Sequence, residues 1–298
     1  MLTSIVQTIN NHRVKWLLFS LWCVLLSVQP DLYSLITEYV GFVFLGVLGA
    51  IFANSTGAGG GVVFVPFFNQ FALSNHTIIA TSFAIQCCGM TAGAITWYKH
   101  YKQHHLKDSQ WSMLGNGLMV TVPFSVMGIL IAQFVLGHYT DAIQGSLHLY
   151  FGLFSIVLAI AIYGSIPLMK RTAFLHKLLS MDMLALGIIS LGGGVVTAWL
   201  SVGVGELVAV YLILRGFNIT LAIALAVILS AFSVWSAIAY HIAVSGQVYW
   251  QIVMFAGAGA IVGGMIAKHV VLFFSPVKLK IFFATWVLVM GLAGLPLF

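Results

Sequence analysis

Long apolar stretches alternate with short polar segments along almost the whole chain. A helix that crosses a bilayer needs about 20 apolar residues, and seven stretches have roughly that length without an interruption. We therefore predict seven ordinary transmembrane helices, at about residues 14–29, 77–98, 111–137, 145–169, 220–243, 248–268 and 279–297. The first of these follows basic residues, as in a signal peptide, but no small-x-small cleavage pattern precedes Pro30, which favours a retained helix.

Two further apolar stretches, residues 39–71 and 181–214, are too long for one span and are interrupted by glycine near the middle. The first contains the run NSTGAGGG at positions 54–61, and the second contains SVGVGE at positions 201–206. Three positions of the two runs match at a constant offset of 146 residues: Ser55 with Ser201, Gly57 with Gly203, and Gly59 with Gly205. The matching runs indicate an internal duplication of the chain.

The basic residues indicate how the two halves are oriented, because cytoplasmic loops are enriched in Lys and Arg. Suppose that the N-terminus is cytoplasmic and that each interrupted stretch is a hairpin returning to the side from which it enters. All 12 Lys and Arg residues then lie on the cytoplasmic side, whereas Asp31, Glu38 and Asp141 lie outside. If each stretch crossed the membrane once, the basic loop at residues 99–107 would lie on the wrong face. We therefore predict hairpins and a C-terminus outside.

The predicted fold is an all-α polytopic membrane protein with two inverted repeats. Each repeat has a broken helical hairpin followed by three transmembrane helices, and an extra N-terminal helix precedes them. The predicted organisation is residues 1–37 for the N-terminal tail and helix, 38–180 for the first repeat and 181–298 for the second. Secondary transporters have this plan, with discontinuous helices that form the substrate site near the midplane. The alternative is that the glycines only permit close helix packing.

The composition excludes an ordinary soluble protein. Hydrophobic residues make up 61% of the 298 residues and charged residues 6%, whereas soluble domains carry about 25% charged residues. The net charge of +6 comes from loops that determine topology, so no nucleic-acid partner is expected. The three cysteines lie inside apolar runs, which argues against a disulfide framework.

A helix that restarts inside the membrane exposes unpaired N–H groups, and such helix ends attract anions. Glycine lets a ligand approach the backbone closely, and no Lys or Arg lies deep in an apolar stretch. Small anions held by neutral donors are therefore the expected ligands. The candidate substrate-binding residues are Ser55, Thr56, Gly57, Gly59, Gly60 and Gly61 of the first run, Ser201, Gly203, Gly205 and Glu206 of the second, and Gln86 on the helix between them.

Glu206 is the acidic residue that this topology places deep inside the membrane, where a carboxylate is a functional hypothesis by default. One interpretation is coupling, because ionised Glu206 would repel an anionic substrate and protonated Glu206 would admit it. The other is a cap that satisfies the first N–H groups of the restarted helix. The sequence leaves both open.

Two other groups of residues have possible chemistry. The spacing of His100 and His104 would allow two metal ligands on one helical face, but a solvated basic loop is the preferred interpretation. Cys87 and Cys88 lie in an apolar run, where a thiol usually serves packing. We therefore expect no metal site, no cofactor and no enzymatic activity.

The duplicated runs STGAGGG and SVGVGE, within about 300 apolar residues, resemble the TauE/SafE sulfite exporter family of membrane permeases. The resemblance covers residues 38–298 and implies transport of sulfite, organosulfonates or related small anions across the cytoplasmic membrane, commonly as export. It also implies binding roles for Thr56, Gly57, Gly59, Gly60, Ser201, Gly203, Gly205 and Glu206. The second motif departs from the all-glycine pattern, because Glu206 aligns with Gly60.

The predicted function is a secondary transporter, with export as the expected direction, for sulfite, an organosulfonate or a related sulfur-containing or carboxylate anion. The expected mechanism is alternating access, with Glu206 as the candidate coupling residue and protons as the candidate coupling ion. The alternatives are an anion channel that uses the broken helices as a filter and a membrane-embedded sulfur-handling enzyme or assembly factor. The expected location is the cytoplasmic (inner) membrane, with the lipid bilayer and a small anion as partners and the oligomeric state open.

Overall fold

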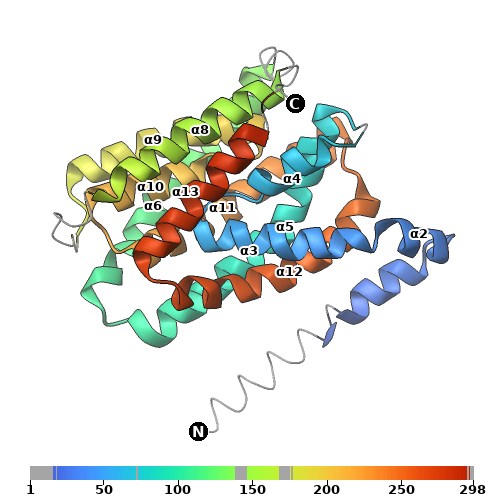
Figure 1. Ribbon diagram of the computed structural model, residues 1–298, viewed down its shortest axis with the longest axis horizontal. Helices are drawn as coiled ribbons and strands as arrows, with labels where there is room; N and C mark the ends of the chain where they lie inside the picture. The colour runs from blue at the N-terminus through green and yellow to red at the C-terminus, as the bar shows by residue number, and fades with distance from the viewer. Residues whose placement is uncertain are drawn as a thin grey trace, which may run out of the picture.

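A computed structural model describes residues 16–293 of the chain except 18, 72, 138–145, 168–174 and 176, together with residue 295. All regular structure in these residues is helical (Figure 1). The helices are α2 (Leu32–Tyr39), α3 (Gly41–Thr56), α4 (Gly61–Phe68), α5 (Asn75–His100), α6 (Met113–Leu130), α8 (Leu147–Ser165), α9 (Ser180–Leu200), α10 (Val204–Arg215), α11 (Ile219–Tyr240), α12 (Trp250–Phe273) and α13 (Pro276–Ala293). A π-helical turn follows α5 at Tyr101–His105 (η1), α6 at Ile131–Val135 (η3) and α11 at His241–Ser245 (η5), and a 3-10 turn, Ser109–Ser112 (η2), precedes α6.

The protein is a multi-pass membrane protein. Five helices in the described residues are long and apolar enough to cross a bilayer, and a sixth is added if α2 and α3, which meet at a bend of 45°, form one span. The predicted spans at 77–98, 111–137, 220–243 and 248–268 are confirmed as such helices. The spans at 145–169 and 279–297 correspond to α8 and α13, whose apolar parts are shorter. In the first predicted span, residues 19–27 are helical.

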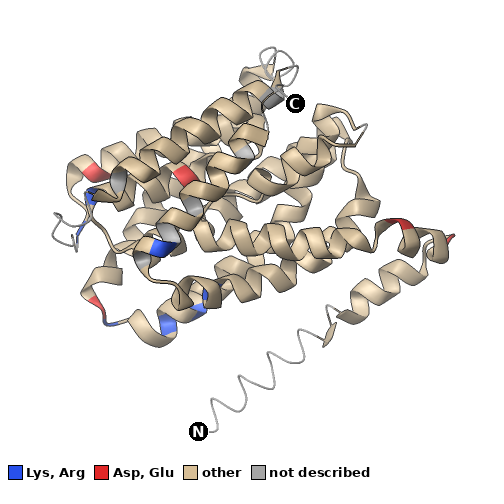
Figure 2. Cartoon of the chain, in the orientation of Figure 1, with Lys and Arg blue, Asp and Glu red and all other residues tan. Residues whose placement is uncertain are grey.

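Some predictions concern parts of the chain that the structure does not describe. Arg13, Lys15, Asp141, Lys170 and Arg171 lie outside the described residues. So do the N-terminus and the last three residues. The Lys and Arg residues coloured blue in Figure 2 gather toward one end of the bundle, whereas the acidic residues around α2 lie at the opposite end.

The first broken stretch, α3 and α4, folds back on itself. Gly57 ends α3 in the left-handed conformation, with φ of 80°, and α4 begins at Gly61. The ring of Phe42, near the start of α3, lies 6.2 Å from Phe68 and 5.9 Å from Phe71 at the far end of α4. The chain therefore returns to the side from which α3 starts, as Figure 1 shows.

The second broken stretch, α9 and α10, also folds back. Ser201 ends α9 with φ of 60°, and Gly203, with φ of 149°, precedes α10. Asp182, near the start of α9, accepts hydrogen bonds from the Tyr211 hydroxyl at 2.7 Å and from Arg215 Nε at 2.6 Å, near the end of α10. This buried carboxylate therefore joins the two ends of the hairpin.

Each break lies at the glycine-rich run where the sequence predicts it, and it divides the stretch into helices of unequal length. α3 has 16 residues and α4 has 8, while α9 has 21 and α10 has 12. A helix of 21 residues is roughly 31 Å long, which is close to the thickness of a bilayer core. Each stretch therefore combines a long limb with a short returning limb.

Glycines bring the long limbs against their neighbours. α3 packs on α12 and α9 packs on α6. A Cβ atom at Gly46 would lie 2.0 Å from the carbonyl oxygen of Ala256 on α12, and one at Gly128 of α6 would lie 2.1 Å from that of Leu191 on α9. Small residues at these contacts let the helix backbones meet, as in other membrane bundles. This packing fixes the position of both breaks.

Candidate functional site

The two breaks meet inside the helical bundle. We call residues 57–60 the first break and residues 201–203 the second break. A Cβ atom at Gly61 would lie 2.2 Å from the carbonyl oxygen of Ser201, and one at Gly205 would lie 2.3 Å from that of Gly57. Only glycine permits such contacts, so glycines of both runs lie where the two chain segments cross.

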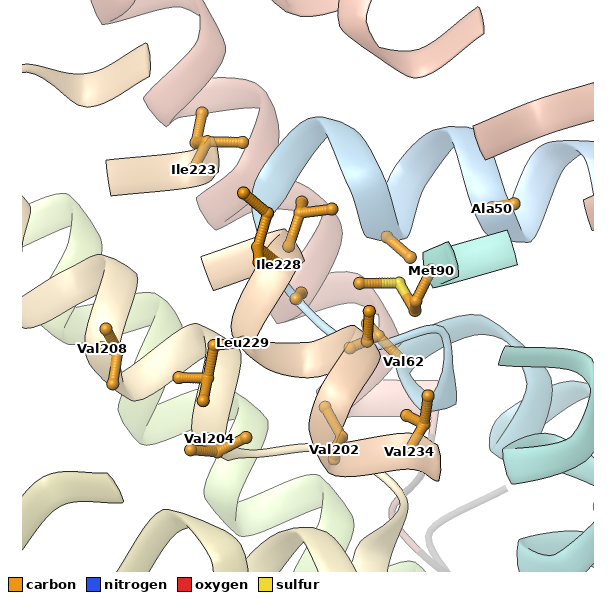
Figure 3. Close-up of a cluster of buried hydrophobic side chains, with 14 of the residues drawn as sticks. Ala50, Val62, Met90, Val202, Val204, Val208, Ile223, Ile228, Leu229 and Val234 are labelled. Carbon is orange, nitrogen blue, oxygen red and sulfur yellow. The ribbon is translucent and has the colours of Figure 1, made fainter. Parts of the chain in front are cut away.

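A small cavity lies at this crossing. Its volume is about 10 Å³, which is close to the minimum for one water molecule. The apolar side chains that line it, Val202, Val204 and Val234, belong to the buried hydrophobic cluster shown in Figure 3. Its lining residues are Gly59, Gln86, Thr197, Ser201, Val202, Gly203, Val204, Gly205, Glu206, Ser230, Ser233 and Val234. The cavity is therefore closed and too small for an oxyanion such as sulfite.

Glu206 bridges the two breaks. Its side chain is fully buried. Carboxylate Oε1 accepts a hydrogen bond from the Gly59 amide at 3.0 Å, and Oε2 accepts one from the Gly203 amide at 2.8 Å. Glu206 is the third residue of α10, so it caps its own helix and also binds the opposite hairpin. The capping interpretation is therefore confirmed as a contact, whereas coupling stays a prediction.

Gln86 joins the same two breaks from the side of α5. Its Oε1 accepts a hydrogen bond from the Gly60 amide at 2.7 Å. Its Nε2 donates to the Ser201 hydroxyl at 2.8 Å and lies 3.2 Å from the Ser201 carbonyl oxygen. The Ser82 hydroxyl, one turn earlier on α5, lies 3.1 Å from the same nitrogen. An amide side chain is needed here because it both accepts from one break and donates to the other.

Several of the N–H groups that were expected to be unpaired at the breaks have protein partners in this arrangement. Besides the amides held by Glu206 and Gln86, the Ala58 amide donates to the Thr56 hydroxyl at 3.2 Å. The Val204 amide donates to the Thr197 hydroxyl at 2.9 Å. A buried N–H without a partner is costly, and the closed cavity leaves little room for water, so protein groups take these positions.

Five of the sequence-predicted residues do not line the cavity: Gly57 and Gly60 of the first break, Gly61 at the start of α4, and Ser55 and Thr56 of α3. The Ser55 hydroxyl donates to the carbonyl oxygen of Ala267 on α12 at 3.4 Å, and the Thr56 hydroxyl donates to that of Phe52 at 2.7 Å. Both residues belong to the last turn of α3, so their side chains serve that helix and its packing. Thr197 was not predicted, although its position one turn before Ser201 on α9 places it beside the break.

The cysteines and histidines lie apart from this cavity. Cys87 and Cys88 line a separate apolar cavity of about 440 Å³ between α5, α11 and α12. His105 pairs with Asp108 at 3.1 Å in the segment between η1 and η2. Within the described residues, no group of three or more His, Cys, Asp or Glu side chains is arranged to hold a metal ion.

The comparison with protein families identifies the chain. The family model described as "Sulfite exporter TauE/SafE" matches residues 42–294. The chain belongs to this family. The match begins at the second residue of α3 and covers both breaks and all the helices that follow them, whereas all of α2 precedes it. Comparisons with curated proteins and with solved structures gave no significant match.

Membership of the TauE/SafE family has a direct consequence for function. The family consists of membrane transporters, and its name refers to sulfite export. A small anion is therefore the class of substrate that the family implies. In this TauE/SafE chain, backbone amides bind the Glu206 carboxylate at the crossing of the two breaks.

Proposed function

We propose that the chain is a secondary transporter that exports a small anion, such as sulfite, an organosulfonate or a related carboxylate. The proposal places the substrate site at the crossing of the two breaks. The observation that carries it is the binding of the Glu206 carboxylate by the amides of Gly59 and Gly203, one from each break. No Lys, Arg or His lines this cavity, so backbone dipoles and neutral donors bind the negative group there.

The packing of the helices supports an inverted-repeat organisation. We propose repeats at residues 38–180 and 181–298 after an N-terminal segment, 1–37. Exchanging α3, α5, α6 and α8 with α9, α11, α12 and α13 turns each main contact into a contact of the structure. α3 packs on α12 as α9 packs on α6, and α5 packs on α12 as α11 packs on α6, while the pairs α5–α11 and α8–α13 each map onto themselves. Both α5 and α11 also continue into a π-helical turn. A two-fold relation between the halves accounts for these paired contacts.

The closed cavity supports alternating access as the mechanism. A volume of about 10 Å³ admits no substrate, so the surrounding helices have to move before an anion enters. Each hairpin is joined at its own base, the second by Asp182 with Tyr211 and Arg215. Such joined hairpins are suited to move as units, in the way that repeats of secondary transporters rock against each other.

Glu206 is the proposed coupling residue, with a proton as the coupling ion. Glu206 is the titratable residue among those that line the cavity. The polar side chains that face it are all uncharged: Gln86 of α5, Thr197 and Ser201 from the end of α9, and Ser230 and Ser233 of α11. Protonation removes the negative charge and one acceptor oxygen, which weakens the bonds to the two break amides. An anionic substrate that enters the cavity is then not repelled by a negative charge on Glu206.

The orientation and the exclusion of enzymatic activity are parts of the same proposal. We propose that the basic end of the bundle in Figure 2 faces the cytoplasm. The proposed location is the cytoplasmic membrane, with the N-terminus inside and the C-terminus outside. Cys87 and Cys88 line a different cavity from Glu206. A thiol enzyme would need them beside the polar groups that do the chemistry.

The test is flux of labelled sulfite and sulfoacetate in proteoliposomes, with and without an imposed pH gradient. We expect saturable flux, exchange of internal for external anion, and acceleration by the proton gradient. Glu206→Gln should lose the gradient dependence, whereas the exposed control Glu38→Gln should keep it. Unsaturable conductance without exchange would indicate a channel, and no flux of either anion would contradict the proposed substrates.

A further inference from the structure

The Glu206 carboxylate has an unusual position for a helix cap. A cap needs only the amides of its own helix, yet one oxygen of Glu206 binds Gly203 and the other binds Gly59, 147 residues away. The side chain is fully buried and no cation lines the cavity around it. The two breaks are therefore arranged as a receptor for one group that carries two acceptor oxygens.

We infer that the Glu206 carboxylate is an internal ligand that occupies the amides destined for the anionic group of the substrate, and that substrate binds by displacing it. This inference rests on the proposed function and deepens it. Between transport cycles Glu206 holds the empty site closed. The substrate then opens the site by taking over the amides of Gly59 and Gly203.

Displacement follows from the space and the charge in the cavity. The free volume beside Glu206 is about 10 Å³, which is too small for an oxyanion while the carboxylate stays in place. Two negative charges in a site of low dielectric also repel strongly. The Glu206 carboxylate therefore leaves the amides before, or as, the anion binds. Its departure removes the direct bond between the second hairpin and Gly59, while Gln86 still contacts both breaks.

The shape of the internal ligand also defines the class of substrate. The carboxylate presents two oxygens on one atom, one to each amide. Sulfite, sulfonates and carboxylates have the same arrangement and can bridge the two breaks. A halide has a single centre and cannot bind both amides in this way. The substrate class is thus an anion with at least two terminal oxygens on one atom.

The direct test is chemical replacement of the missing carboxylate by formate. In Glu206→Ala the two amides lose their ligand, and free formate is small enough to take its place. We expect sodium formate to raise the melting temperature of purified Glu206→Ala in detergent in a saturable way, relative to sodium chloride at equal ionic strength. Wild type and the control Glu38→Ala should show no such difference. An equal effect on all three proteins, or no effect on Glu206→Ala, would overturn the inference.

A second variant keeps the test decisive if Glu206→Ala does not fold. Glu206→Gln retains the size of the side chain but has one acceptor oxygen in place of two, and its NH2 group is a donor that cannot accept from the second amide. Labelled sulfite should bind Glu206→Gln at least tenfold more tightly than wild type at neutral pH, because the competing carboxylate is gone. Equal or weaker binding would contradict displacement.

These measurements separate the inference from the proposed function. Formate stabilisation needs no transport, so it reports on the amides themselves. A formate effect without any sulfite or sulfonate binding would overturn the substrate assignment and support the internal ligand. Flux without a formate effect would support the transporter and overturn the internal ligand.

Discussion

Replacement of Gln86 by leucine should destabilise the protein strongly, because Gln86 bonds to both breaks. Leucine has a similar size but cannot bond to the Gly60 amide, the Ser201 hydroxyl or the Ser201 carbonyl oxygen. Hydrogen bonds between transmembrane segments contribute about 0.6 kcal/mol on average and up to about 1.7 kcal/mol. Loss of three such bonds therefore predicts a decrease of roughly 2–5 kcal/mol in the free energy of unfolding.

A matched control is Gln133→Leu, on the turn after α6. Gln133 is also a buried membrane glutamine, but its Nε2 donates one hydrogen bond, to the Ala237 carbonyl oxygen at 3.0 Å, and its Oε1 has no partner. The same substitution should cost about 0.6 kcal/mol there. Both side chains are buried and the substitution is the same, so the difference between the two variants reports the hydrogen bonds at the breaks.

The assay is reversible unfolding in mixed micelles with increasing SDS, followed by tryptophan fluorescence. We expect the Gln86→Leu transition at clearly lower SDS than that of Gln133→Leu. If the two variants lost the same stability, the bonds of Gln86 to both breaks would have no special weight. The argument that this side chain joins the two hairpins would then be refuted.

Three further predictions concern packing, the second hairpin and the thiols. Gly61→Ala should lower the melting temperature and abolish transport, because its Cβ would lie 2.2 Å from a backbone carbonyl oxygen. Gly192→Ala, with open space around it, should behave as wild type. Equal melting temperatures of the two variants would contradict the crossing of the breaks. Asp182→Asn should destabilise the protein by roughly 1–3 kcal/mol, because it weakens the bonds that join the ends of the second hairpin; an unchanged unfolding transition would argue against that joint. Replacement of both Cys87 and Cys88 by Ser should preserve sulfite flux, since the two thiols lie outside the closed cavity. Complete loss of flux in a folded double variant would favour thiol chemistry.

The sequence predicted the membrane helices best where apolar length alone decides the outcome. Bilayer thickness sets the length of a span, so α5, α11 and α12 follow directly from uninterrupted apolar runs. The breaks were also predictable, because runs of glycine end helices and allow positive φ, as at Gly57 and Gly203. What local sequence does not contain is the contact between the breaks.

The partners of the break amides depend on tertiary structure. Glu206 reaches Gly59 from 147 residues away, and no local pattern predicts that pairing. Ser55 shows a different limit, because its place in the run NSTGAGGG suggested a role in substrate binding. The helix α3 instead continues through Thr56, and this turns the Ser55 hydroxyl towards α12. The end of a helix is decided by packing as well as by composition.

The central claim is that an anion crosses the membrane through the point where the two breaks meet. The most direct measurement is initial flux of labelled sulfite in proteoliposomes containing Gly205→Leu, Gly192→Leu or wild type at equal amounts of folded protein. A side chain at Gly205 would lie within 2.3 Å of the Gly57 carbonyl oxygen and the Ser230 hydroxyl, inside the crossing, whereas Gly192 faces open space. We predict saturable flux for wild type and Gly192→Leu and background flux for Gly205→Leu. Flux through Gly205→Leu at the wild-type rate would contradict the claim.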